Sequence, residues 1–308
     1  MRFFSFSGFR LRARHIARHI QKYASAGIAG GAAIALFFLA PTLIHQRKDV
    51  AYGPHPRHRL DLCAPVLHSA RTPAVLLIHG GGWVGGEKDG LAELCHYFAE
   101  KGILAASVEY RLADGRNENR WPAQLVDVQL AVRWLRTNAY ELGIDPYHIC
   151  AYGNSAGGHL ATWLLIEQSI RPGDYAGELQ AVSPEISCAI TNSGPVDFSM
   201  LPPSFDSVLS LLAPLECKGS RECTVAELSP LASINKTLAS PLLISHGRHD
   251  ELVPIEQATK LLAALEHFHS AVSFINYDGA HEFLETSSSV QRKVLALQLD
   301  FIKHGNAR

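Results

Sequence analysis

The chain lacks an excess of either charge and lacks any closely paired cysteines. Its 308 residues carry a formal net charge of −1 at pH 7, so nothing in the balance indicates a polyanionic partner such as nucleic acid. Six cysteines occur without a C-x-x-C pair, which argues against a zinc or redox motif. The chain also has no internal repeat. These absences favour a globular protein that acts on something other than nucleic acid.

For four of the cysteines, the sequence context predicts whether they are free thiols or form a disulfide. Cys150 and Cys188 lie in apolar, strand-like runs, so we expect buried free thiols at both positions. Cys217 and Cys223 bracket a polar turn over residues 218–222. They would form a local disulfide outside the cytoplasm and would stay free in a reducing compartment.

Acidic residues are missing from residues 1–48, where six basic residues precede an uncharged stretch over residues 23–44. As a helix, residues 24–44 would span about 30 Å, the thickness of a bilayer core. We therefore expect residues 1–45 to form a basic N-terminus with a transmembrane anchor or uncleaved signal. The positive-inside rule then places residues 46–308 outside the cytoplasm, in a periplasmic location. The alternatives are a cleaved signal on a secreted protein, a mitochondrial transit peptide and a buried helix of the main domain.

Apolar runs of strand length alternate with helical patterns along the rest of the chain. Residues 73–79 read as a strand buried on both faces, and residues 122–140 as a long amphipathic helix. This alternation predicts an α/β fold in three layers with a mostly parallel sheet. Residues 195–240 carry several prolines and show no strong period. Further strands are expected over 58–63, 103–110, 148–152, 186–191, 242–246 and 272–277, and further helices over 91–101, 158–166, 254–265 and 290–302.

The pentapeptide Gly153-Asn154-Ser155-Ala156-Gly157 has the pattern G-x-S-x-G between an expected strand and an expected helix. A serine on such a sharp turn has a strained backbone and an exposed hydroxyl. The flanking glycines avoid a Cβ collision across the turn. The pattern predicts that Ser155 is a nucleophile, and the alternative is an ordinary glycine-rich loop.

A second glycine-rich segment, His79-Gly80-Gly81-Gly82-Trp83, follows the buried strand over residues 73–79. Its backbone N–H groups could hold the negative charge of a tetrahedral oxyanion, with the N–H of Ala156 as the partner donor. A phosphate loop is the alternative, but the segment lacks the lysine and the spacing of a P-loop.

A serine nucleophile needs a histidine base that is oriented by a carboxylate. Asp250 and His281 follow the expected strands over 242–246 and 272–277, which places both at the sheet edge that carries Ser155. The order Ser155, Asp250, His281 is that of an α/β-hydrolase triad. Local rivals are Glu251 or Asp278 as the acid and His249 as the base. His159, within the helix after the nucleophile, is expected to be a packing residue or a residue that supports the catalytic side chains from behind.

Together these motifs resemble the α/β-hydrolase carboxylesterases of the hormone-sensitive-lipase-like and feruloyl-esterase-like (BD-FAE) group. The resemblance implies an eight-stranded α/β-hydrolase fold with a small lid insertion over about 196–230. It implies Ser155 as nucleophile, Asp250 as acid, His281 as base, and an oxyanion hole from the N–H groups of Gly81, Gly82 and Ala156. It extends over Tyr52-Gly53-Pro54, Arg59-Leu60-Asp61, Tyr110-Arg111-Leu112, Trp121-Pro122-Ala123, Asp127, residues 131–135 and His246-Gly247-x-x-Asp250-x-Leu252-Val253-Pro254.

Three departures from the resembled pattern loosen the subfamily assignment without removing a catalytic group. Asn154 stands where lipase-like members usually carry an acidic residue, Glu109 replaces the usual aspartate before Tyr110, and Ala113-Asp114-Gly115 replaces the common Ala-Pro-Glu. The expected lid holds six large apolar residues that could line an acyl pocket or simply belong to the core: Phe198, Met200, Leu201, Phe205, Leu209 and Leu212.

The resulting expectation is a serine carboxylic-ester hydrolase that acts through an acyl-enzyme on a small-molecule ester. Its mechanism needs neither a metal nor an organic cofactor. The alternatives are a kynurenine-formamidase-like amidase with the same machinery and a catalytically inactive hydrolase fold that serves as a binding module. The acyl and alcohol groups and the oligomeric state stay open at this stage.

Overall fold

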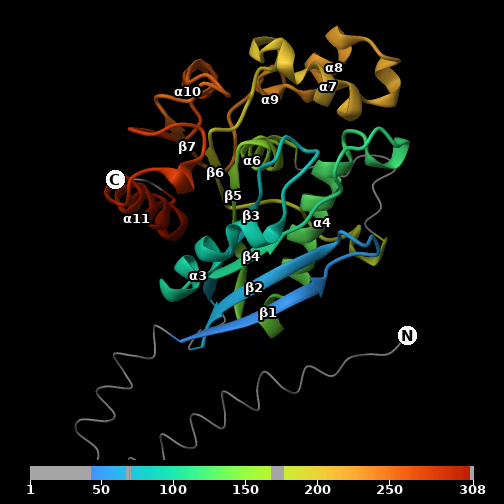
Figure 1. The fold of residues 1–308 in the computed structure, drawn as a ribbon. Helices are drawn as coiled ribbons and strands as arrows, with labels where there is room; N and C mark the ends of the chain where they lie inside the picture. The colour runs from blue at the N-terminus through green and yellow to red at the C-terminus, as the bar shows by residue number, and fades with distance from the viewer. Residues whose placement is uncertain (1–42, 67–68, 70, 168–176, 306–308) are drawn as a thin grey trace, which may run out of the picture.

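The computed structural model describes residues 43–66, 69, 71–167 and 177–305, which build one eight-stranded sheet (Figure 1). The strand order is β1-β2-β4-β3-β5-β6-β7-β8. β2 pairs antiparallel with β1 and β4, and every later pair is parallel, so the expected α/β-hydrolase sheet is confirmed. The strands are β1 (Ile44–Ala51), β2 (Arg59–Pro65), β3 (Thr72–Ile78), β4 (Leu104–Val108), β5 (Ile144–Asn154), β6 (Cys188–Asn192), β7 (Leu242–Gly247) and β8 (Val272–Tyr277).

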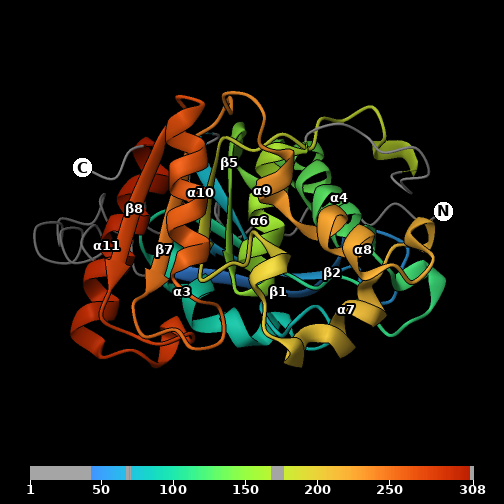
Figure 2. The ribbon, with the colours of Figure 1, turned by 90° about the horizontal axis from the view of Figure 1, so that it is seen from above.

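Helices cover both faces of this sheet, as the expectation of three layers requires (Figure 2). α4, α6 and α10 bury one face, whereas α3 and α11 bury the other. The central strands β3, β4 and β6 are buried almost throughout, which explains their continuous apolar runs. The helices are α3 (Ala92–Glu100), α4 (Ala123–Thr137), α5 (Ala139–Leu142), α6 (Ala156–Ile166), α7 (Asp206–Leu212), α8 (Arg221–Leu228), α9 (Pro230–Ser233), α10 (Glu256–His267) and α11 (Ser288–His304), with short 3₁₀ turns at Lys88–Leu91, Asn117–Asn119, Gly177–Leu179, Phe198–Met200, Pro203–Phe205, Leu215–Cys217 and Phe283–Glu285.

Strand β1 was not expected from the sequence. The sequence predicted a membrane helix that ends at Ile44, within an N-terminal unit that ends at residue 45. In the structure, Ile44 and His45 belong to β1, which pairs with β2. The charged residues Arg47, Lys48 and Asp49 hide the strand pattern, although they suit an edge strand that must resist pairing with other chains. The rest of the expected anchor lies outside the described residues. Within the described ranges, no helix combines the length and the apolar character that crossing a bilayer requires.

The expectation of free thiols at Cys150 and Cys188 is wrong, because these two residues form a disulfide. They face each other on the adjacent strands β5 and β6, with their Cα atoms 4.6 Å apart. An apolar strand run predicts burial of a cysteine but does not show which strand lies beside it. Cys63–Cys95 and Cys217–Cys223 are also disulfides, so none of the six cysteines is free.

The expected lid lies between β6 and β7 and contains α7, α8 and α9, which gather at one end of the molecule near α4 and α6 (Figure 1). Four of its six candidate acyl-pocket residues are buried and belong to the main core: Phe198, Leu201, Leu209 and Leu212. Met200 and Phe205 are only partly buried. Most of the apolar residues of the insertion therefore hold it against the body of the enzyme fold.

Candidate active site

Ser155 lies on a sharp turn between β5, which ends at Asn154, and α6, which begins at Ala156. Its φ of 54° and ψ of −119° are a strained combination for a residue with a side chain. The turn requires glycine on both sides. A Cβ on Gly153 would lie 1.9 Å from the Gly157 carbonyl oxygen, and one on Gly157 would lie 2.0 Å from the Ile78 carbonyl oxygen.

The segment over residues 79–83, called the oxyanion loop below, packs directly against this turn. A Cβ on Gly80 would lie 3.2 Å from the Cβ of Ser155. Gly81 and Gly82 have positive φ angles of 105° and 58°, which favour glycine. Among the described residues, no hydrogen bond uses the N–H groups of Gly81 and Gly82. Both donors are therefore available for a negatively charged oxygen close to Ser155.

The structure brings the three predicted catalytic side chains together from the ends of β5, β7 and β8. The Ser155 Oγ lies 2.8 Å from the His281 Nε2. On the other side of the ring, the His281 Nδ1 lies 2.8 Å from the Asp250 Oδ2. This geometry allows the serine hydroxyl to donate to Nε2 while Nδ1–H donates to the carboxylate. A proton can then move from Ser155 to His281.

Asp250 is held as a carboxylate by its surroundings. Burial raises the pKa of the carboxyl, but hydrogen bonds from His246, His281 and the Val253 N–H outweigh burial and hold the pKa well below its usual range. The Oδ1 accepts the backbone N–H groups of Leu252 and Val253 at 3.0 and 2.8 Å. The carboxylate is thus fixed in place and charged at neutral pH.

His246 is a supporting residue to which the sequence reasoning gave no role. Its Nε2 lies 2.8 Å from the Val253 carbonyl oxygen and 3.3 Å from the Asp250 Oδ2. The ring is almost completely buried at the end of β7. A proton on Nε2 can be shared between the two oxygens, so His246 helps to orient the carboxylate. Its position four residues before Asp250 on a strand end was the only available signal.

The rival residues point elsewhere. His249 and Asp278 are both exposed and form a pair with each other at 3.0 Å. Glu251 is exposed, and His281 has no hydrogen bond to it among the described residues. The geometry therefore favours Asp250 over Glu251 and Asp278 as the acid, and His281 over His249 as the base.

His159 links the nucleophile helix to the oxyanion loop and the lid. It is fully buried on α6, where its Nδ1 accepts the Nε1–H of Trp83 at 3.1 Å. Its Nε2 lies 2.7 Å from the Leu228 carbonyl oxygen, at the end of α8, and 3.0 Å from the Trp163 Nε1. Because the indole N–H of Trp83 can only donate, Nδ1 must be an unprotonated acceptor, and the ring is therefore neutral.

We expect His159 to make the fold sensitive to acid. Burial lowers its pKa from 6.5 to about 3, so between those values the unfolded chain binds a proton that the native protein does not. The free energy of unfolding therefore falls as the pH drops through this window. His159 alone should lower it by about 2 kcal/mol between pH 7 and pH 5. Urea unfolding at pH 7 and pH 5 measures the effect. Between the two pH values, the free energy of unfolding of a His159→Gln variant should fall by about 2 kcal/mol less than that of wild type. An equal fall in both proteins would contradict this account.

A cavity of about 190 Å³ adjoins the candidate catalytic residues. It is bordered by Gly80 and Gly81 of the oxyanion loop, by Asn154 before the nucleophile and by Glu282 after the base. The Asn154 Nδ2 lies 3.4 Å from the Glu282 Oε2. Ser155, Asp250 and His281 themselves do not line this cavity, so it lies next to the catalytic side chains rather than around them. Among the residues that the structure describes, no group of three or more potential ligand side chains is placed to bind a metal ion.

Comparisons with known proteins find esterases among the relatives of this chain. "Esterase LipQ" of Mycobacterium tuberculosis is 27% identical over 265 residues, which cover 82% of this chain and 60% of that protein. "Probable carboxylic ester hydrolase LipM" of the same organism is 32% identical over 221 residues, covering 68% of this chain and 49% of that protein. The chain thus spans about half to three fifths of the length of these relatives.

Solved structures share the fold. The native Est2 esterase of Thermogutta terrifontis superposes with a TM-score of 0.67 at 26% identity, covering 83% of this chain and 91% of that one. A truncated carbohydrate esterase from gut microbiota superposes with a TM-score of 0.72 at 23% identity, covering 85% and 96%. The BD-FAE family model matches residues 60–265, which is more than half of the chain. The chain is a member of the BD-FAE family.

Proposed function

We propose that the protein is a serine carboxylic-ester hydrolase that works through an acyl-enzyme intermediate. The observation that carries the proposal is the continuous hydrogen-bonded line from Ser155 through His281 to Asp250, with 2.8 Å at each step. The strained turn aims the hydroxyl out of the sheet edge, and the two free N–H groups of the oxyanion loop lie beside it. These are the parts that acyl transfer needs.

In the first half of the reaction, the Ser155 Oγ attacks the ester carbonyl carbon as its proton moves to the His281 Nε2. The carbonyl oxygen becomes negatively charged and accepts hydrogen bonds from the N–H groups of Gly81, Gly82 and Ala156. Collapse of this intermediate breaks the bond to the alcohol, which leaves with the proton from His281. Water then repeats these steps on the acyl-enzyme and releases the acid.

The names of the relatives support ester hydrolysis rather than amide hydrolysis. LipM and LipQ are described as an ester hydrolase and an esterase. One solved structure of Thermogutta terrifontis esterase 2, 25% identical to this chain, is phosphoramylated by tabun. Covalent capture by an organophosphate is typical of an activated nucleophile. The relatives give no corresponding support to the kynurenine-formamidase-like alternative.

We propose a short acyl group on the substrate, because the cavity of about 190 Å³ that borders the oxyanion loop and Asn154 is small. A panel of p-nitrophenyl acetate, butyrate and octanoate tests both the reaction and this preference, with N-formylkynurenine as the amide substrate. We expect kcat/KM to be highest for acetate or butyrate and to fall at least tenfold for octanoate. Strong turnover of N-formylkynurenine with negligible ester turnover would overturn the proposal in favour of the amidase.

We further propose that the enzyme works outside the cytoplasm, tethered by the basic and apolar segment that precedes β1. Three disulfides support this location, because such bonds persist in oxidising compartments. Cell fractionation with maleimide labelling of the untreated lysate tests it. The expected result is a membrane-bound protein that reacts with maleimide only after reduction. Recovery from the cytoplasmic fraction with six reactive thiols would reject it.

A further inference from the structure

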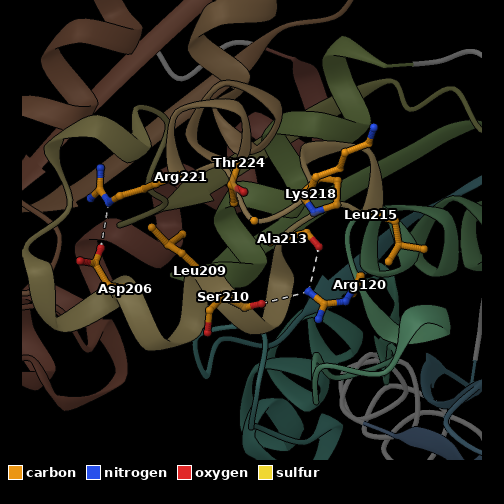
Figure 3. Close-up of a pocket in the computed structure, with 11 residues that line it drawn as sticks. Arg120, Asp206, Leu209, Ser210, Ala213, Leu215, Lys218, Arg221 and Thr224 are labelled. Atoms are coloured by element: carbon orange, nitrogen blue, oxygen red, sulfur yellow. Dashed lines mark hydrogen bonds and ion pairs between the residues drawn. The ribbon is translucent and has the colours of Figure 1, made fainter.

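A second and larger cavity, of about 380 Å³, lies in the lid insertion and is called the lid cavity below (Figure 3). It opens between α7 and α8, with Arg120 of the segment before α4 on one side. None of the residues assigned to catalysis lines it, so it is distinct from the site around Ser155. Its volume falls in the range of small-molecule sites, roughly 300–1,000 Å³. Nothing in the proposed ester hydrolysis uses this cavity.

The inner wall of the lid cavity is apolar. Leu209, Ala213 and Pro214 line it and are buried, and Leu215 at its border leaves 56% of its surface exposed. Thr224 adds a buried hydroxyl, but that hydroxyl already donates to the Ser220 carbonyl oxygen. The wall thus offers contact to a hydrocarbon group and few free hydrogen-bonding groups.

The border of the lid cavity carries an excess of positive charge. Arg120, Lys218 and Arg221 line it together with one carboxylate, Asp206. The Arg221 Nε pairs with the Asp206 Oδ1 at 3.0 Å, and Figure 3 shows this pair across the cavity from Arg120. In the described part of the chain, no carboxylate lies within ion-pair distance of Arg120 or Lys218. Two cations on this border therefore have no counter-charge from the residues that the structure describes.

Arg120 is only partly used by the protein. Its Nη1 donates to the carbonyl oxygens of Ser210 and Ala213 at 3.0 Å each, which caps the end of α7. Its Nε is buried and has no hydrogen-bond partner among the described residues. This Nε has almost no accessible surface and does not face the open cavity, so Arg120 offers a ligand the positive charge of its guanidinium group rather than a free Nε–H.

The cavity border is held in place before any ligand arrives. The Cys217–Cys223 disulfide closes the short loop that carries Lys218 and Arg221. The backbone N–H of Trp121, next to Arg120, donates to the Leu212 carbonyl oxygen at 2.9 Å and ties the end of α7 to the body of the fold. A fixed site loses less entropy when it binds a ligand than a mobile one does.

We propose that the lid cavity binds an amphipathic organic carboxylate. The carboxylate group would lie at the border, among Arg120, Lys218 and Arg221, and its hydrocarbon chain would pack against Leu209 and Pro214. Inorganic phosphate would meet the charges alone and would leave the apolar wall uncovered, so we expect it to bind too weakly to compete with such an acid. A neutral lipid of the same length would cover the wall but would leave the cations without a counter-charge. Both properties of the cavity together select an acid with an apolar body.

Isothermal titration calorimetry with sodium decanoate tests the proposal, using the whole protein with its disulfides intact. A double variant, Lys218→Gln with Arg221→Gln, removes two border charges that lie on the surface, so the fold should be retained. Lys236→Gln is the matched control, because Lys236 is an exposed lysine that does not line the cavity. We expect the double variant to bind decanoate at least tenfold more weakly than wild type and the control to bind it equally well.

Two further ligands separate charge from apolar contact. Decanol should bind at least tenfold more weakly than decanoate, and sodium phosphate at millimolar concentration should leave decanoate binding unchanged. Equal decanoate affinity in the double variant and wild type would overturn the proposal. So would decanol binding as tight as that of decanoate, or displacement of decanoate by phosphate. Because no ester is hydrolysed in these titrations, their result is independent of the proposed reaction.

Discussion

Ser155→Ala is expected to lower kcat for p-nitrophenyl acetate by about 10⁶-fold, to a small residual rate that comes from the oxyanion hole and substrate binding alone. The reason is that no other hydroxyl can take the place of Oγ at 2.8 Å from the His281 Nε2. The variant keeps the backbone of the turn and removes only one oxygen, so its thermal midpoint should stay close to that of wild type. Steady-state rates and a thermal melt of both proteins measure the two effects.

Covalent labelling gives a second measurement of the same role. A fluorophosphonate probe should add one label to wild type and none to Ser155→Ala, as intact-protein mass spectrometry would show. Ser204→Ala, which removes an exposed serine outside the site, is the matched control and should react like wild type. Labelling of Ser155→Ala would contradict the assignment of the nucleophile. Absence of labelling in wild type, together with absence of ester turnover, would favour an inactive hydrolase fold that serves as a binding module.

The sequence could predict those parts of the site that follow from local patterns. Gly153 and Gly157 flank Ser155 in a turn that admits only glycine at these two positions, because a Cβ at either of them would collide with the backbone. Asp250 and His281 each follow an apolar strand, and parallel strands bring their carboxyl ends to one edge of the sheet. Local periodicity and chain order were therefore sufficient to bring three distant residues together.

Contacts between distant segments could not be predicted in this way. The Cys150–Cys188 disulfide depends on β5 lying beside β6 in a register that places the two residues opposite each other. Strand β1 is polar because it lies at the sheet edge, and a polar run carries no period that reveals a strand. The role of His246 depends on a 3.3 Å approach to Asp250 that no spacing rule provides. Two of these misses thus concern pairings between distant segments, and the third, β1, concerns the identity of an element.

Asp250→Asn should lower kcat by about 10⁴-fold, although it changes neither size nor shape. The backbone N–H groups of Leu252 and Val253 donate to Oδ1, so the amide oxygen of the variant must occupy that position. Its NH₂ group is then forced into the Oδ2 position, 2.8 Å from the His281 Nδ1. There it donates to Nδ1 and places the ring proton on Nε2, facing Ser155. In that tautomer His281 cannot accept the serine proton.

The same substitution at an exposed carboxylate gives the matched control. Asp278→Asn breaks only the surface pair with His249 and should leave kcat within twofold of wild type. His246→Gln retains Asp250 and removes one hydrogen bond to it, worth roughly 1.5 kcal/mol, so we expect about a tenfold loss in kcat with KM unchanged. Rates of the three variants under saturating p-nitrophenyl acetate rank these effects. If Asp250→Asn were no slower than His246→Gln, the tautomer argument would be wrong, and Asp250 would act only by holding the ring in place.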